Sequence, residues 1–286
     1  MKKRVILGLI ISLNILALAN CQNTDKNPAN NGDDDIPVPE GYTLFWNDEF
    51  SGTEIDLTKW EHEVNAQGGG NNELQYYTDR PVNSFIENGK LIIQALKETY
   101  TGAEGTRDYT SARLRTAKKG DWKYGRFEIK AKLPYGQGLW PAIWMLPTDW
   151  IYGGWAASGE IDIMELIGHQ PNKVYGTLHY GGAYPNNVHS GDFYTLAEGN
   201  FNDNFHVFTL DWDETSFKWY VDGVFYQEQT EWSTEGHDYP APFDQFFHLL
   251  LNVAVGGNWP GNPDASTVFP QRMEVDYVRV FKKTGK

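Results

Sequence analysis

Three acidic residues in one short segment are the strongest chemical signal in this sequence. Residues 159–166 read GEIDIMEL, so the acidic positions are Glu160, Asp162 and Glu165. Side chains alternate between the two faces of a strand, so Glu160 and Asp162 share one face, whereas Glu165 would lie on the other. One extra residue at position 163 or 164, a β-bulge, would return Glu165 to the first face, and bulges are enriched beside active sites. The segment therefore predicts a bulged strand that presents its carboxylates together.

Such a cluster admits three interpretations from the residues alone. An exposed acidic face would ionise in the ordinary way, and a calcium site would use the carboxylate oxygens as ligands. Hydrolysis of a glycosidic bond would need one protonated and one ionised carboxyl group. The chain also holds 11 Trp, 16 Tyr and 15 Phe, and the segment Gly138–Met145 (GLWPAIWM) precedes the acidic one. These flat aromatic surfaces suit sugar rings and favour the hydrolytic interpretation.

Composition and charge narrow the classes of protein and partner. The 286 residues are 40% hydrophobic and 22% charged and include a single Cys. These values exclude a disordered chain, a disulfide scaffold and a protein with many membrane spans. With 24 Lys and Arg against 38 Asp and Glu, the net charge is −14. Polyanions need basic grooves, so this balance argues against nucleic acids and sulfated polymers and favours a neutral ligand.

The elements that must position the acidic residues read as strands. In Arg126–Leu133 the apolar residues occupy alternate positions, which is the period of a strand with one buried face. Asp222-Gly223, between two strand-like segments, is typical of a type I′ hairpin turn. Leu249–Val255 and Met273–Phe281 also read as strands, and no segment carries a helical stripe over three turns. We predict one all-β domain over residues 42–283, a β-sandwich or jelly roll.

The first 21 residues read as an export signal. Three basic residues at positions 2–4 precede a 15-residue apolar run, Val5–Ala19, which is shorter than the about 20 residues that a membrane-spanning helix needs. Cys21 follows the run and resembles the lipidated Cys of a bacterial lipobox; an ordinary signal peptide is the alternative. Residues 22–41 are polar and predict a flexible tether. We expect an extracytoplasmic protein with a mature net charge of −17, since the leader holds three basic and no acidic residues.

Six segments in order along the domain form a recognisable set. They are Tyr109–Leu114, Tyr124–Glu128, Trp140–Trp144, Gly159–Glu165, Gly176–Tyr180 and Asn252–Trp259. Together they resemble glycoside hydrolase family 16, specifically its bacterial laminarinases, and the resemblance covers residues 42–283. The Glu-x-Asp-x-x-Glu spacing is similar to the bulged form of laminarinases, whereas lichenases usually have Glu-x-Asp-x-Glu.

This resemblance implies a fold and a mechanism. The fold would be a concanavalin-like β-jelly-roll sandwich with a substrate cleft on its concave sheet, and the reaction a retaining double displacement. Glu160 would be the nucleophile, and Glu165 the general acid and then the general base. Asp162 would orient the nucleophile and tune the pKa values of both glutamates. No cofactor is expected for catalysis.

The resemblance also implies substrate-binding residues and a metal site. Trp140, Trp144 and Trp259 would stack on sugars, although a Trp in a sandwich can equally fill the core. A structural calcium ion would lie on the convex face, and the alternative is that the carboxylate in the last strand is merely exposed. The resemblance also implies Arg113 and Asn71 as residues that hydrogen-bond sugar hydroxyls, and His179 as a residue that lines the leaving-group side of the cleft. For calcium it implies Asp276, Glu49 and the carbonyl of Gly89.

The leading functional hypothesis is an endo-acting hydrolase of β-1,3-glucans such as laminarin, with mixed-linked glucans as further substrates. A galactan-directed enzyme of the agarase or carrageenase kind is a second hypothesis, and the acidic charge disfavours its sulfated substrates. A non-catalytic carbohydrate-binding β-sandwich is the third. We expect a monomer that binds no nucleic acid and meets a membrane only through a lipid anchor at Cys21.

Overall fold

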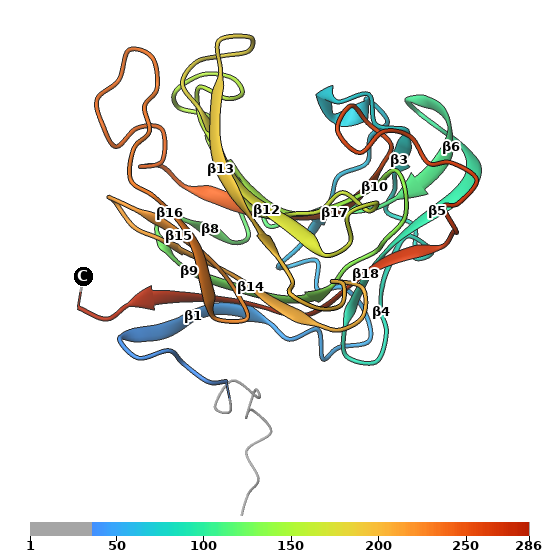
Figure 1. Ribbon diagram of the computed structural model, residues 1–286, viewed down its shortest axis with the longest axis horizontal. Helices are drawn as coiled ribbons and strands as arrows, with labels where there is room; N and C mark the ends of the chain where they lie inside the picture. The colour runs from blue at the N-terminus through green and yellow to red at the C-terminus, as the bar shows by residue number, and fades with distance from the viewer. Residues whose placement is uncertain (1–35, 286) are drawn as a thin grey trace, which may run out of the picture. The chain divides into compact units, whose positions relative to one another are not determined.

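The fold consists of two stacked β-sheets, shown in Figure 1. The computed structural model describes residues 36–285. The predicted export signal, its Cys21 and residues 22–35 of the predicted tether lie outside the described residues. One compact unit begins at Val38, four residues before the predicted domain start, and the Gly41 carbonyl accepts a hydrogen bond from the Thr284 amide at 2.9 Å. No helix among the described residues is long and apolar enough to span a membrane.

The outer, convex sheet has ten strands, and β18 lies near its middle between β9 and β5. Its strands are β1 (Tyr42–Asp48), β3 (Gln75–Tyr77), β4 (Ser84–Ile86), β5 (Leu91–Gly102), β6 (Gly105–Ser111), β9 (Gly125–Lys132), β14 (His206–Trp212), β15 (Phe217–Val221), β16 (Val224–Gln229) and β18 (Gln271–Lys283).

The inner sheet has eight strands and, in Figure 1, bends around the open space at the top of the view. The order β13-β12-β11-β10-β17-β7-β2 places the acidic strand β11 between β12 and β10. Its strands are β2 (Glu61–His62), β7 (Arg113–Arg115), β8 (Asp121–Trp122), β10 (Leu139–Pro147), β11 (Glu160–Glu165), β12 (Lys173–Tyr180), β13 (Val188–Thr195) and β17 (Phe247–Val255).

The core lies between the two sheets and follows the predicted alternation. In β9, Phe127, Ile129 and Ala131 are fully buried, whereas the residues between them are partly exposed. All residues of β17 are buried, because its cleft-side face is covered as well as its core face. The predicted hairpin is also confirmed: Asp222 and Gly223 have φ values of 50° and 77° and connect β15 to β16. The jelly-roll prediction is confirmed at the level of two packed β-sheets.

The predicted bulge lies in β11 between its two neighbours. On β12, Asp162 faces Thr177 and Glu165 faces Tyr175, so three residue steps on β11 span two on β12. The register against β10 shifts over the same stretch. Ile163 and Met164 are both buried in the core, so the extra residue is accommodated on the core side. The bulge therefore lets Glu165 return to the concave face.

Candidate active site

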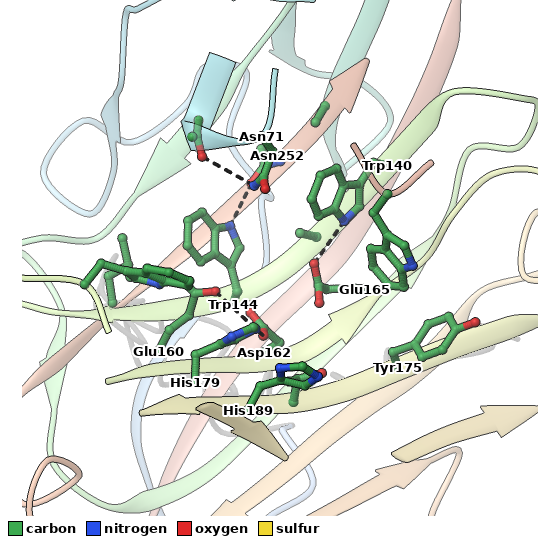
Figure 2. A pocket seen from close by; sticks show the side chains of 18 of the residues that line it. Asn71, Trp140, Trp144, Glu160, Asp162, Glu165, Tyr175, His179, His189 and Asn252 are labelled. Atoms are coloured by element: carbon green, nitrogen blue, oxygen red, sulfur yellow. Dashed lines mark hydrogen bonds and ion pairs between the residues drawn. The ribbon is translucent and has the colours of Figure 1, made fainter. Parts of the chain in front are cut away.

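A cleft of about 1180 Å³ runs over the concave face of the inner sheet. All the predicted catalytic and sugar-binding residues line it, and Figure 2 shows the centre of this region. The sequence therefore identified residues that the fold brings together from four strands and two loops. They are Asn71, Arg113, Trp140, Trp144, Glu160, Asp162, Glu165, His179 and Trp259.

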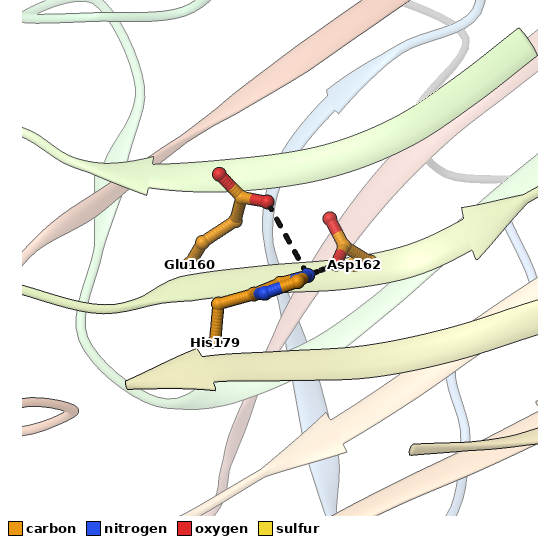
Figure 3. Close-up of side chains that lie close together, drawn as sticks. All are labelled: Glu160, Asp162 and His179. Carbon is orange, nitrogen blue, oxygen red and sulfur yellow. Dashed lines mark ion pairs between the residues drawn. The ribbon is translucent and has the colours of Figure 1, made fainter. Parts of the chain in front are cut away.

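The three carboxylates of β11 share the floor of this cleft with an imidazole from β12 (Figure 2). Figure 3 shows two of them, Glu160 and Asp162, beside His179. His179 pairs with Glu160 across the two strands. Its Nε2 lies 3.3 Å from Asp162 Oδ2 and 3.8 Å from Glu160 Oε1. The imidazole therefore sits where it can stabilise negative charge on both carboxylates. Among the described residues, His179 is the ion-pair partner of the Asp162 carboxylate. The predicted role of Asp162 in orienting Glu160 stays a prediction.

Each glutamate is held by one indole N–H group. Trp155 Nε1 donates to Glu160 Oε2 at 2.8 Å, and Trp140 Nε1 donates to Glu165 Oε1 at 2.9 Å. A donor fixes the direction of a carboxyl group and stabilises its ionised form. The second oxygen of each glutamate accepts no hydrogen bond from the described residues, which leaves it available for chemistry in the cleft.

Burial raises the pKa of all three carboxyl groups, each to about 8. The charge of Asp162 raises the pKa values of Glu160 and Glu165 further, and the His179 charge lowers them in part. Because neighbouring carboxylates cannot all ionise at low cost, the cluster retains protons near neutral pH. A cluster that holds both a protonated and an ionised carboxyl group can supply an acid and a nucleophile together.

Aromatic rings form one end of the cleft. The Trp140 and Trp259 rings meet edge to face at 5.5 Å, and Tyr175 meets Trp259 at 4.9 Å. Trp259 remains 40% exposed, so its ring is open to a ligand. The Trp140 side chain has two roles, because its N–H group donates to Glu165 and its ring lines the cleft.

Arg113 is set into the wall of the cleft rather than standing free in it. Its guanidinium lies 4.6 Å from the Tyr77 ring and 5.2 Å from the Trp144 ring. Glu63 accepts a charge-assisted hydrogen bond from it at 3.3 Å, and only 12% of the side chain is exposed. Most of its donors are therefore turned toward protein, and its predicted contact with sugar hydroxyls stays a prediction.

Several residues that line the cleft escaped the sequence analysis, and three of them contact side chains of the predicted site. Trp155 binds Glu160, and its signal was a Trp in a Gly-rich loop just before the acidic strand. Asn252 accepts from Trp144 Nε1 at 2.7 Å, and its signal was one amide inside the apolar segment Leu249–Val255. Glu73 is 6% exposed and lines the cleft, but its position after a glycine-rich loop offered no pattern that specifies burial.

One cluster in the cleft and the predicted group on the convex face contain atoms that could bind a metal ion. Ligand atoms of Glu160, Asp162 and His179 lie within 4.8 Å of one another. Calcium prefers oxygen ligands, so the imidazole argues against the calcium interpretation of this cluster. On the convex sheet, Glu49 accepts two hydrogen bonds from Arg279, and Asp276 lies 2.8 Å from Lys130 Nζ.

The predicted convex calcium site is chemically suited to the ion but already partnered. Its two carboxylates and the Gly89 carbonyl offer hard oxygen atoms. However, Arg279 and Lys130 now neutralise those carboxylates, so an ion would have to displace both cations. Calcium at this place stays a prediction.

Comparison with known proteins adds a family to this geometry. The model of the glycosyl hydrolases family 16 matches residues 52–279. Glucan endo-1,3-beta-glucosidase A1 of Niallia circulans is 44% identical over 86% of this chain, which spans only 39% of that protein. Beta-glucanase of Rhodothermus marinus is 43% identical, with 84% of this chain and 85% of that protein covered. The solved laminarinase catalytic domain of Thermotoga maritima has a TM-score of 0.77 and 44% identity, with 86% of this chain and 100% of that chain covered.

The raised pKa of Glu160 predicts a pH-dependent cost to stability. A carboxyl group with a higher pKa in the folded state binds its proton more tightly there. Ionisation of Glu160 therefore lowers the free energy of unfolding. This loss is absent below about pH 4.3, the pKa of the group in the unfolded chain, and it grows as the pH rises toward about 8. We expect Glu160→Gln to raise the free energy of unfolding by on the order of 2 kcal/mol at pH 8 and to change it little at pH 4. Urea unfolding at both pH values measures this difference.

The exposed Glu198 provides the control for this comparison. Glu198→Gln should leave the difference between the two pH values as in the wild-type protein. An equal gain from Glu160→Gln at pH 4 and pH 8 would show that burial of the charge is not the cause.

Proposed function

This chain belongs to the glycosyl hydrolases family 16, and from that premise we propose that it is an endo-acting hydrolase of laminarin-type β-1,3-glucans. One observation carries the proposal: the bulged strand β11 sets Glu160, Asp162 and Glu165 together in the floor of an aromatic-lined cleft. The same cleft would accept β-1,3 bonds within mixed-linked glucans.

The proposed reaction is a double displacement with retention of configuration. Ionised Glu160 attacks the anomeric carbon while the bond to the leaving oxygen breaks, and Glu165 gives its proton to that oxygen. Glu165 then takes a proton from water, which attacks the anomeric carbon and releases Glu160. The raised pKa of Glu165 suits the first step, because an ordinary glutamate would hold too few protons at neutral pH.

The charges that line the cleft support a neutral glucan over a sulfated galactan. Glu73 and Asp192 line it together with the three carboxylates of β11. Among the described residues that line the cleft, only Arg113 carries a guanidinium, and it is already paired with Glu63. A sulfated polymer would meet net negative charge there, so repulsion would weaken its binding.

The contacts of the glutamates also separate an enzyme from a binding module. A protein that only binds glucan gains nothing from burying three like charges, which costs stability. Here Trp140 and Trp155 hold Glu165 and Glu160 in place despite that cost. Carboxyl groups that are kept in place at such a cost to stability are expected where they take part in the reaction.

We expect the purified protein to release reducing sugar fastest from laminarin when laminarin, lichenan, agarose and carrageenan are compared. Glu160→Gln and Glu165→Gln should each lower kcat by about 10²–10⁴-fold, because each removes a group that reacts. Glu198→Gln is the matched control and should keep the wild-type rate. NMR of the first product should show the β-anomer, as retention requires.

Two other results would replace this proposal. Faster release from agarose or carrageenan would keep the mechanism and overturn the substrate. Folded protein that binds laminarin equally well with and without Glu160→Gln, and releases no sugar from any polymer, would support a binding module instead.

Location is part of the proposal, on the ground that Cys21 lies two residues after the end of the apolar run of the leader. In a bacterial host, we expect the full-length chain to incorporate labelled palmitate and to sediment with membranes. Cys21→Ala should abolish the label and move the protein to the soluble fraction. An unlabelled wild-type chain that is exported and soluble would instead support an ordinary signal peptide.

A structural calcium ion near Asp276, Glu49 and Gly89 is the last part of the proposal, supported by the oxygen donors that these residues offer. We expect calcium added after EGTA dialysis to raise Tm by several degrees, since an ion that binds only the folded protein stabilises it. Asp276→Asn should remove this rise. Glu274→Gln is the control, because Glu274 lies on the same strand as Asp276 and also pairs with a lysine, Lys132 of β9, at 2.9 Å. A calcium response that is absent, or equal in both variants, would defeat the site.

A further inference from the structure

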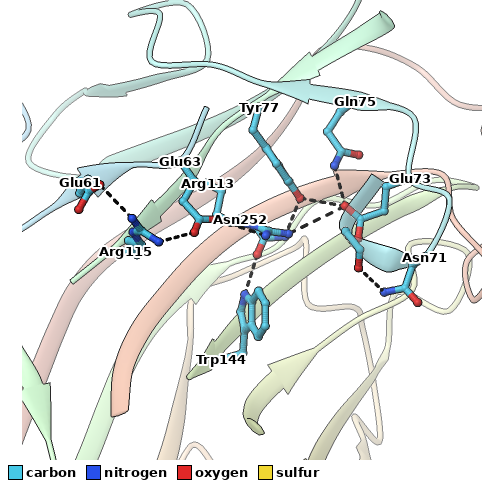
Figure 4. A network of polar contacts seen from close by, with 11 residues as sticks. Glu61, Glu63, Asn71, Glu73, Gln75, Tyr77, Arg113, Arg115, Trp144 and Asn252 are labelled. Carbon is cyan, nitrogen blue, oxygen red and sulfur yellow. Dashed lines mark hydrogen bonds and ion pairs between the residues drawn. The ribbon is translucent and has the colours of Figure 1, made fainter. Parts of the chain in front are cut away.

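Behind Trp144, the wall of the cleft contains a chain of side-chain hydrogen bonds (Figure 4). Trp144 Nε1 donates to Asn252 Oδ1 at 2.7 Å, and Asn252 Nδ2 donates to the Tyr77 hydroxyl oxygen at 3.1 Å. The Tyr77 hydroxyl lies 3.4 Å from Glu73 Oε2 and donates to it. This relay joins an aromatic surface of the cleft on β10 to β17, to β3 and to the loop before β3.

The direction of every bond in the relay is fixed by chemistry. An indole N–H can only donate, so the amide of Asn252 must present its oxygen to Trp144 and its nitrogen to Tyr77. Burial and the nearby Glu73 charge raise the pKa of Tyr77 far above its ordinary value, so the phenol keeps the proton that it donates. Asn252, Tyr77 and Glu73 are 3%, 1% and 6% exposed, so water cannot easily replace a lost partner.

The guanidinium of Arg113 packs against the same residues. It lies between the Tyr77 and Trp144 rings, and its Nη2 is 4.0 Å from Glu73 Oε2. The Tyr77 ring therefore supports one face of this cation while the Tyr77 hydroxyl belongs to the relay. Removing the hydroxyl keeps the ring against Arg113, although the hydroxyl also interacts with that guanidinium.

At its Glu73 end, the relay reaches the loop before β3, and Asn71 of this loop also lines the cleft. Glu73 N donates to the Gly68 carbonyl at 3.2 Å, and Asn71 N donates to the same oxygen at 2.8 Å. Asn258 N donates to the Asn71 carbonyl at 2.8 Å, next to the exposed ring of Trp259. A displacement of Glu73 would therefore reach the segment that carries Trp259.

From this geometry we propose that Tyr77 is a positioning residue for glucan binding. Its hydroxyl holds Asn252, and through it the Trp144 ring, at a fixed orientation relative to the carboxylates of β11. Tyr77 is not among the residues that line the cleft, so any effect on substrate must pass through its partners. The inference rests on the proposed function, because it takes Trp144 as a surface on which a sugar packs.

Tyr77→Phe is the direct test, because it removes one hydroxyl and keeps the ring that stacks on Arg113. We expect KM for laminarin to rise about fivefold, the loss of roughly one hydrogen bond, with kcat within twofold of wild type. A sugar contact that is made equally in the ground state and the transition state changes KM without changing kcat. Initial rates over a range of laminarin concentrations, at a temperature below the measured Tm of each variant, give both constants.

Tyr76→Phe is the matched control for loss of a buried hydroxyl. Tyr76 neighbours Tyr77 on β3, is also 1% exposed, and its hydroxyl accepts a hydrogen bond from the Glu104 amide at 3.1 Å. It does not line the cleft. Both variants should lose a similar amount of thermal stability, but only Tyr77→Phe should change KM.

A double-mutant cycle with Trp144→Phe tests the route of the effect. Phenylalanine has no N–H group, so the Trp144→Phe variant lacks the hydrogen bond to Asn252. In that variant, Tyr77→Phe should add less than a twofold change in KM. A full fivefold addition would show that Tyr77 does not act through Trp144 and would overturn the inference.

The remaining outcomes separate this inference from the proposed function. Wild-type protein that does not hydrolyse laminarin would defeat the proposed function. Active wild-type protein, together with Tyr77→Phe and Tyr76→Phe variants of equal KM, would defeat only the role of Tyr77.

Discussion

The extra residue in β11 is the constraint on which the site depends. Strand alternation alone would send Glu165 into the core, where Ile161, Ile163 and Met164 are packed. A charged group there would be too costly to keep, and the cleft would hold one acid fewer. Because β10 and β12 pair with β11 on both sides of the bulge, the irregularity is held in place and does not slip along the strand. The fold thus provides a rigid frame for a local departure from regular geometry.

That departure creates an electrostatic problem that the surrounding residues reduce. Three carboxyl groups lie side by side, with Asp162 buried and the two glutamates partly buried, and this burial raises the pKa of each. Two indole N–H groups and the His179 ring lie where they stabilise negative charge. They do not remove the cost completely, and the remaining preference for bound protons is the property that acid catalysis needs. Stability and reactivity are therefore opposed within one cluster of residues.

Local patterns in the sequence were sufficient to predict the strands, the hairpin at Asp222-Gly223 and the bulge, because each of these features depends on residues that are neighbours along the chain. The partners of the site residues could not be predicted in the same way. Trp140 was expected to pack on sugar, yet its N–H also binds Glu165, which is a matter of how β10 and β11 lie side by side. The surroundings of Arg113 come from Tyr77 and Trp144, which are distant in sequence and meet only in the folded sheet.

Strand β10 connects the parts of the cleft that bind and the parts that react. Trp140 and Trp144 point into the cleft, whereas Ile143 and Met145 are fully buried in the core. One strand therefore carries both the donor that holds Glu165 and the ring that the buried relay orients. Since the same backbone is paired with β11 and with β17, neither ring can shift along the strand without disturbing the pairing of its neighbours. The orientation of the sugar-binding wall thus depends on packing that extends well behind the surface of the cleft, as far as β3 and the loop before it.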